Sequence, residues 1–124
     1  MSSSDLINVG LSGRANDKLD ELTKELGIFA DKIDGYRFGI TLALAHGAIG
    51  GELVDRKNLF NVGSLDPDQL IKTAVEALMP DALETNTVYR LVERLADWGV
   101  SELHAQAANG PIDFDTILEQ TSAS

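Results

Sequence analysis

The stretch INVGLSGRAND, residues 7–17, decides how the start of this chain folds. Ile7, Val9 and Leu11 alternate with small or polar residues, and an alternation of period two is typical of a β-strand with one buried face. Ser12 comes next, and serine is a preferred N-cap residue of helices. The stretch therefore predicts a short strand that leads directly into a helix.

The helix that follows is amphipathic and has a clear end. One apolar stripe is formed by residues spaced three or four apart, namely Ala15, Leu19, Leu22 and Leu26. This spacing predicts a helix over residues 13–26 with one buried face. Gly27 stands directly after it, where a glycine in the left-handed conformation commonly ends a helix.

The next predicted helix, over residues 32–48, is apolar over most of its circumference. Its apolar residues are Ile33, Tyr36, Phe38, Ile40, Leu42, Leu44 and Ala45. A helix of this kind must be buried on several sides, and Gly35 and Gly39 would permit close backbone approach. We expect the Gly50-Gly51 pair to end it. Because no second strand is predicted, we expect both the strand and this helix to find their partners in a second copy of the chain.

Residues 6–48 resemble a known family. VGLSGRANDKLDELTKELG, followed by YRFGITLALA, resembles the ribbon–helix–helix superfamily of dimeric DNA-binding proteins in its V-x-L-S pattern, leucine stripe and glycine. The spacing from Gly27 to Arg37 is similar to that of the DndE family of DNA-phosphorothioation proteins. The resemblance implies a homodimer whose two strands form an antiparallel ribbon, an element that fits the major groove of duplex DNA.

The predicted DNA contacts come from the strand and from the basic residues near it. They are Asn8, Ser12, Arg14, Lys18, Lys32 and Arg37. Only the first two are polar side chains on the outward face of the strand, where bases would be read, and the basic residues would contact phosphate or form surface ion pairs instead. Asp31 and Asp34 would compete with phosphate at the start of the second helix. The ribbon therefore either contacts DNA or serves dimerisation alone.

The remainder of the chain is predicted to be helical and acidic. Asp66-Pro67-Asp68-Gln69 is a typical helix start, and Gly99 is expected to separate two later helices. The whole chain is thus predicted to be mostly α, with a ribbon–helix–helix-like segment, a linker, and an acidic helical extension. Their ranges are 1–50, 51–65 and 66–124, and the later helices are expected over 88–98, 101–108 and 113–121.

Charge is distributed unevenly along the 124 residues, whose formal net charge is −10. Residues 1–62 hold nine acidic and seven basic residues, whereas residues 63–124 hold eleven acidic and three basic ones. The second half is therefore expected to repel phosphate and anionic membranes. It would suit a basic protein partner.

Enzymatic, metal and membrane functions find little support in the sequence. The chain has no cysteine, no phosphate-binding loop, no nucleophile elbow and no pair of histidines at ligand spacing. We expect no enzyme, no cofactor, no metal, no signal peptide and no membrane span, and a cytoplasmic location. A ligand pocket lined by Tyr89, Trp98 and His104 is the remaining alternative of this class.

Two hypotheses fit these observations better. The first is a homodimeric DNA-binding or regulatory protein of ribbon–helix–helix type. The second is a non-enzymatic adaptor subunit built on the same dimer, within a DNA-modification or defence complex, whose acidic half docks a basic partner. The resemblance favours the first hypothesis and the charge distribution favours the second.

Overall fold

The computed structural model describes residues 5–108, so the predicted element at 113–121 lies outside it. The described chain is mostly helical and carries one antiparallel two-stranded sheet near its N-terminus. In chain order its elements are β1 (Asn8–Leu11), α1 (Gly13–Asp20), the π-helical turn η1 (Glu21–Glu25), α2 (Lys32–His46), β2 (Lys57–Asn61), α3 (Val62–Leu65), α4 (Leu70–Leu78), the 3-10 turn η2 (Ala82–Glu84) and α5 (Val88–Ala108).

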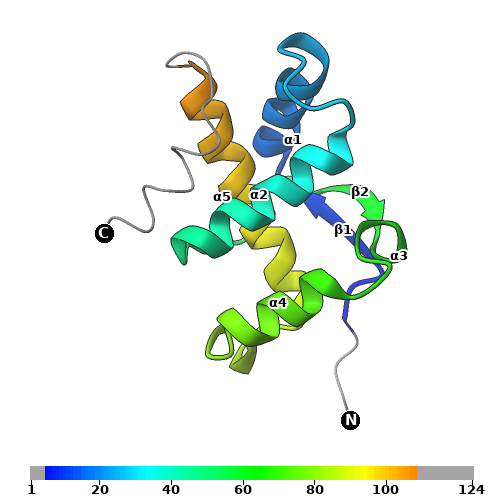
Figure 1. Cartoon of the computed structure of the whole chain (residues 1–124), viewed down its shortest axis with the longest axis vertical. Helices are drawn as coiled ribbons and strands as arrows, with labels where there is room; N and C mark the ends of the chain where they lie inside the picture. The colour runs from blue at the N-terminus through cyan, green and yellow to red at the C-terminus, as the bar shows by residue number, and fades with distance from the viewer. Residues whose placement is uncertain (1–4, 109–124) are drawn as a thin grey trace.

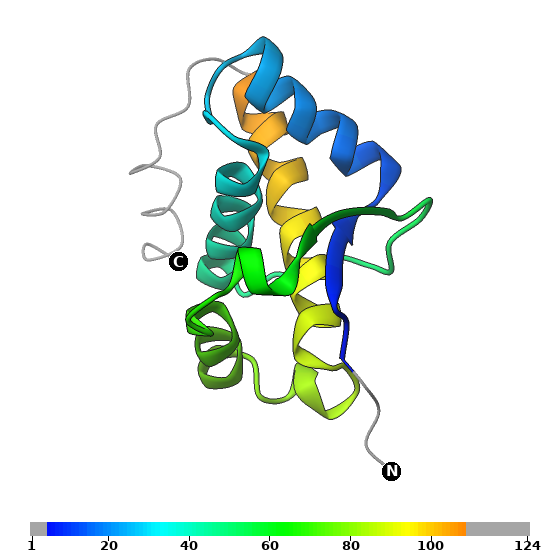
Figure 2. The same ribbon diagram turned by 90° about the vertical axis from the view of Figure 1, so that its right-hand side faces the viewer.

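Helix α5 is the element around which the others pack. It runs along the length of the molecule in Figures 1 and 2, and α1, α2, α4 and β1 all contact it. The prediction that Gly99 separates two helices is wrong, because α5 continues through it. A Cβ atom at Gly99 would lie 1.9 Å from the carbonyl oxygen of Gly39. This glycine therefore allows α5 to cross α2 at backbone contact instead of ending a helix.

Helix α2 is buried by other elements of its own chain. Tyr36, Leu42 and Ala43 are completely buried, with α5 as the main neighbour of the helix. The predicted close approach at Gly39 is confirmed. The helix ends earlier than predicted, at His46, because Gly47 adopts a left-handed φ of 63° and its N–H bonds back to the last turn. One chain thus supplies the partners that had been expected from a second copy.

The predicted turns around α1 are confirmed. The Ser12 hydroxyl accepts a hydrogen bond from the Ala15 N–H and so caps the helix, and Gly27 has a left-handed φ of 63°. Leu19 and Leu22 are completely buried, whereas Leu26, expected on the same stripe, is exposed. The difference follows from η1, whose π-helical turn shifts the angular position of the residues after it.

The strand β1 pairs within its own chain, so the prediction that no second strand exists is wrong. Strand β2 runs antiparallel to it, with Asn8 opposite Asn61 and Leu11 opposite Lys57. The sequence of β2, KNLFN, does not show the alternation of apolar and polar residues that predicts a strand, because its two apolar residues are adjacent. Asparagine, which occurs twice in it, is also uncommon in strands. Residues expected to be an irregular linker therefore hold β2 and α3.

The predicted helix start at Asp66 lies four residues before the observed first residue of α4. The Asp66 carboxylate nevertheless caps this helix, because it accepts hydrogen bonds from the N–H groups of Ile71 and Lys72 at 2.9 and 3.0 Å. It also accepts one from the Tyr89 hydroxyl at 2.8 Å. A single buried acid thus joins α4 to the first turn of α5.

Candidate functional site

The edge of β1 that faces away from β2 is occupied by side chains. Alternate residues of an antiparallel strand direct their backbone groups to opposite edges. The Gly10 N–H donates to Glu93 at 2.9 Å, and the Gly10 carbonyl accepts from the Tyr36 hydroxyl at 2.9 Å. The Ser12 N–H donates to Asp97 at 2.7 Å. A second copy of β1 would have to displace these bonds before it could pair with this edge.

A buried ion pair holds this arrangement together. Glu93 is only 5% exposed, and its carboxylate contacts the Arg56 guanidinium at 2.5 and 2.7 Å. Arg56 also donates to the Asn8 carbonyl at 3.0 Å. The pair therefore ties α5, β1 and the segment before β2 to one another, and Glu93 is a structural acid.

The six residues predicted to contact DNA have different environments. Lys32 forms an ion pair with Asp20 at 3.0 Å, and Arg37 donates to the carbonyl oxygens of Ser64 and Leu65. Their charged groups hold helices and loops together. Asn8 is exposed at the sheet. Gly10, expected to face outward with it, is buried, whereas Ile7, expected to face the helices, is 74% exposed.

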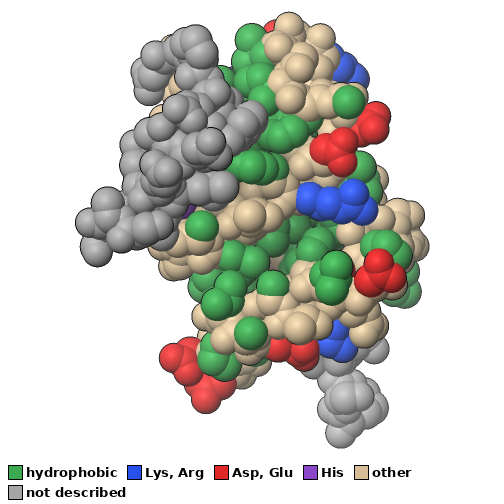
Figure 3. All heavy atoms as spheres, in the orientation of Figure 1, with side chains coloured by type: hydrophobic (Ala, Val, Ile, Leu, Met, Phe, Trp, Pro, Cys, Tyr) green, Lys and Arg blue, Asp and Glu red, His purple; other side chains and the backbone are tan. Residues whose placement is uncertain are grey.

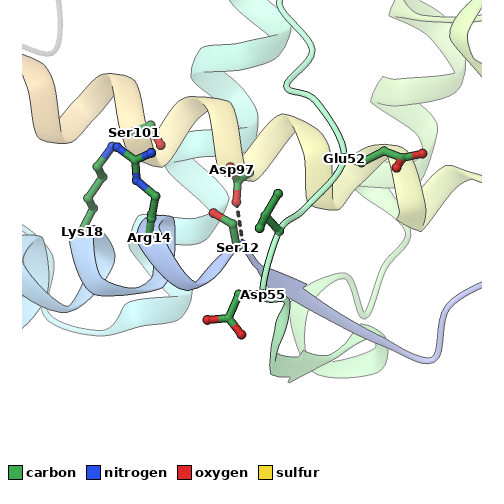
Figure 4. A pocket seen from close by; sticks show the side chains of 8 residues that line it. Ser12, Arg14, Lys18, Glu52, Asp55, Asp97 and Ser101 are labelled. Atoms are coloured by element: carbon green, nitrogen blue, oxygen red, sulfur yellow. Dashed lines mark hydrogen bonds between the residues drawn. The ribbon is translucent and has the colours of Figure 1, made fainter.

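Three of the six predicted residues, Ser12, Arg14 and Lys18, line one cleft between α1, α5 and the loop before β2. This α1–α5 cleft has a volume of about 470 Å³ and is completed by Glu52, Val54, Asp55, Asp97 and Ser101. Figure 4 shows Arg14 and Lys18 reaching together toward Ser101 on α5, with the acidic residues spread along the rest of the cleft. Within residues 5–108 neither cation has an ion pair or a side-chain hydrogen bond.

A second cavity lies at the beginning of α5 and shares Glu52 with the α1–α5 cleft. This arginine cavity has a volume of about 460 Å³ and is lined by Glu52, Leu53, Arg56, Thr85, Asn86, Arg90, Glu93 and Arg94. Sequence reasoning missed it. Arg90 and Arg94 were visible as cations four residues apart on a predicted helix, and such residues share a helix face. The contribution of Arg56 could not be seen, because it depends on where the loop before β2 lies.

Helix α4 exposes a leucine at each of its ends. Ile71 and Val75 face inward, while Leu70 and Leu78 are 71% and 63% exposed. A groove of about 340 Å³ lies between α2 and the start of α4, and Leu70 is one of the residues that line it. The exposed acids around this helix are Asp68, Glu76, Asp81 and Glu84. Figure 3 shows hydrophobic side chains gathered over α4 with acidic ones at their lower edge. We call the surface formed by Leu70, Leu78 and these four acids the α4 surface.

The residues of the alternative ligand pocket lie in three separate environments. Tyr89 contacts Asp66, the ring of Trp98 is 5.5 Å from that of His46, and His104 contacts Glu21. Burial, followed by the hydrogen bond that the Tyr89 hydroxyl donates to Asp66, raises the pKa of Tyr89 above its ordinary value. Burial also raises the pKa of Tyr36. Both phenols are therefore neutral hydrogen-bond donors to structural partners.

Comparisons with protein-family models, with curated proteins and with solved structures give no significant match. Within residues 5–108, histidine and acidic side chains do not gather in threes as a metal site requires. None of the helices in this part of the chain has the length and apolar character needed to cross a bilayer. The candidate functional features within residues 5–108 are the α1–α5 cleft, the arginine cavity and the α4 surface.

Proposed function

We propose that this chain is a non-enzymatic protein-interaction module whose α4 surface docks a basic, amphipathic segment of a partner protein. The observation that carries the proposal is the exposure of Leu70 and Leu78 on a helix that already buries Ile71 and Val75. Leucines exposed at both ends of a short helix, one of them lining a groove, are typical of surfaces that bind another protein.

The charge around these leucines supports a basic partner. Asp68, Glu76, Asp81 and Glu84 are all exposed around α4, and Lys72 is the single basic residue between Leu65 and Thr87. A segment with leucines on one face and lysines or arginines on the other would bury the leucines and place its cations beside the acids. Electrostatic complementarity of this kind accelerates association and selects among partners.

Docking by a single chain agrees better with the fold than a ribbon dimer does. Strand β1 and helix α2 both find their partners inside one chain, so neither feature requires a second copy. The docking function is accordingly assigned to a single chain that binds one partner segment. Sedimentation equilibrium of the chain alone should give the mass of a monomer.

The test uses a fluorescent synthetic peptide with leucines on one helical face and lysines on the other. Fluorescence anisotropy should show saturable binding that weakens as salt increases. The double variant Leu70→Ser/Leu78→Ser should weaken it at least about tenfold, since a buried leucine contributes about 1.5–3 kcal/mol. Val54→Ser is the matched control, because Val54 is 77% exposed but lies in the α1–α5 cleft.

Two outcomes would contradict the docking proposal. One is equal binding of a peptide with the same composition but scrambled order, which would show that only net charge is recognised. The other is an equal loss of affinity in Val54→Ser and in the leucine double variant. Because all three substituted side chains are exposed, unfolding should not confuse the comparison.

A second candidate function, contact with the phosphate backbone of duplex DNA, is favoured by one observation. Arg14 and Lys18 share a helix face and have no acidic partner within residues 5–108. Binding of a duplex at low salt should then fall steeply with salt and be lost in Arg14→Glu/Lys18→Glu. The charge-matched control is Lys24→Glu/Lys57→Glu. Absence of binding at low salt would exclude this function.

A further inference from the structure

The arginine cavity combines suitable size with an unusual concentration of positive charge. Its volume of about 460 Å³ falls within the range of small-molecule sites, about 300–1,000 Å³. Three of the chain's five arginines, Arg56, Arg90 and Arg94, line it. They come from two separate segments, the loop before β2 and the first two turns of α5, so the fold brings them together.

The acids in this cavity do not neutralise all three arginines. Glu93 contacts Arg56 through two nitrogens, so each of these charges compensates the other. Glu52 is exposed and forms no ion pair within residues 5–108. In the same part of the chain Arg90 and Arg94 have no carboxylate partner. Two guanidinium groups on one helix face therefore keep their positive charge available.

Arg94 is positioned by neutral groups. Its Nε donates to the Gly50 carbonyl at 2.8 Å, and its Nη1 donates to the Asn86 side-chain oxygen at 3.2 Å. The other terminal nitrogen, Nη2, has no acceptor within residues 5–108. The Thr85 hydroxyl oxygen accepts from the Asn86 amide at 3.3 Å, so its own proton is available to a ligand. The Arg94 guanidinium and the Thr85 hydroxyl thus supply hydrogen-bond donors for a ligand in the cavity.

The net charge of the chain does not exclude an anion here. At physiological salt, charges more than about 8 Å away are largely screened, so the local set of groups decides what binds. A concave site with low-dielectric walls also concentrates the field of the charges that line it. The expectation that the second half of the chain repels phosphate therefore does not extend to this cavity.

We propose that the arginine cavity binds the phosphate group of a small phosphorylated ligand. Arg90 and Arg94 hold the anion, the Thr85 hydroxyl donates to it, and Asn86 and Gly50 position Arg94. Arginine is well suited to this task because its planar donors match two phosphate oxygens at once. No residue of α4 lines this cavity, so docking of a peptide and binding of phosphate are tested by different substitutions.

The test is an NMR titration of the full chain with inorganic phosphate at constant ionic strength. Saturable shifts are expected for the Arg94 side-chain Nε–H, the Asn86 side-chain amide and the Thr85 backbone amide. Arg90→Gln should weaken the fitted affinity at least about tenfold, as expected for loss of a charged hydrogen-bond donor. Because Arg90 is exposed and forms no ion pair within residues 5–108, the variant should fold normally.

Lys72→Gln is the control, because Lys72 is the remaining basic residue of the C-terminal half and lies outside the cavity. It should leave the phosphate affinity unchanged. The proposal is overturned if the shifts do not saturate, if they occur elsewhere, or if Lys72→Gln weakens binding as much as Arg90→Gln. Acetate is titrated in parallel, and affinity equal to that of phosphate would overturn the assignment of a phosphate group.

Discussion

The crossing of α2 and α5 makes a sharp prediction for Gly99→Ala. The added Cβ atom would lie 1.9 Å from the Gly39 carbonyl oxygen and 2.5 Å from its Cα. Non-bonded heavy atoms attract optimally at about 3.5–4.0 Å, so the two helices must separate by more than about 1 Å. The atoms in the way belong to the backbone and cannot rotate aside. Separation of the helices would loosen the packing of Tyr36 and Leu95 in the core.

The magnitude follows from two opposing terms. At an exposed position inside a helix, replacing glycine by alanine stabilises the helix by about 1 kcal/mol. Overpacking a core costs about 1–3 kcal/mol and sometimes more, and a backbone collision belongs at or above the upper end of this range. We expect Gly99→Ala to lower the free energy of unfolding by at least about 2 kcal/mol. Gly39→Ala should cost less, because its nearest contact would be 3.1 Å.

Urea denaturation followed by far-ultraviolet circular dichroism measures this difference. Gly51→Ala is the matched control, since an added Cβ atom there meets no atom within 4 Å, and it should change stability by less than about 0.5 kcal/mol. If Gly99→Ala is as stable as the parent chain, or more stable, the helices do not cross at this residue. The backbone contact between α5 and α2 at Gly99 and Gly39 would then be wrong.

Three other predictions concern buried polar groups. Both tyrosines, Tyr36 and Tyr89, have a pKa raised above the ordinary 10.0. The neutral phenols therefore contribute fully to the stability of the fold below pH 10. This contribution is lost as the pH rises through the pKa values of the folded state. Phenolate absorbance should therefore appear only well above pH 10 or together with unfolding, and an ordinary titration near pH 10 would contradict their burial. Asp66→Asn should bring the pKa of Tyr89 down toward its ordinary value without restoring it, because burial is the largest cause; an unchanged pKa would contradict the contact. Glu93→Gln should cost about 1–3 kcal/mol in chemical denaturation, because its hydrogen bonds lose their charge assistance, whereas the exposed Glu84→Gln should change little; equal stability of the two variants would contradict the buried ion pair.

The candidate sites were only partly accessible to sequence reasoning. Arg14 and Lys18 were predicted as contacts, and the structure places both in one cleft. Lys32 and Arg37 looked equivalent to them in sequence, yet both bind groups of their own chain. Whether a surface cation is paired depends on neighbours that are distant in sequence, and no local pattern records them. The arginine cavity was missed because its third arginine comes from another segment.

Several local elements of this protein follow from short-range sequence patterns. The Ser12 cap, the left-handed Gly27 and helix α2 follow from side chains that act within a few residues, so short-range periodicity and capping are sufficient to predict them. The burial of the apolar α2 was likewise predictable, because a helix without a polar face cannot remain in water.

What those elements pack against depends on contacts between distant parts of the folded chain. Strand β1 could have paired with a second copy or with its own chain, and β2 supplies the partner although its sequence has no strand periodicity. Gly99 would be a helix end by local rules, but contact with Gly39 makes it the middle of α5. In both cases the deciding energy comes from contacts between residues far apart in sequence, which appear only after the chain has folded.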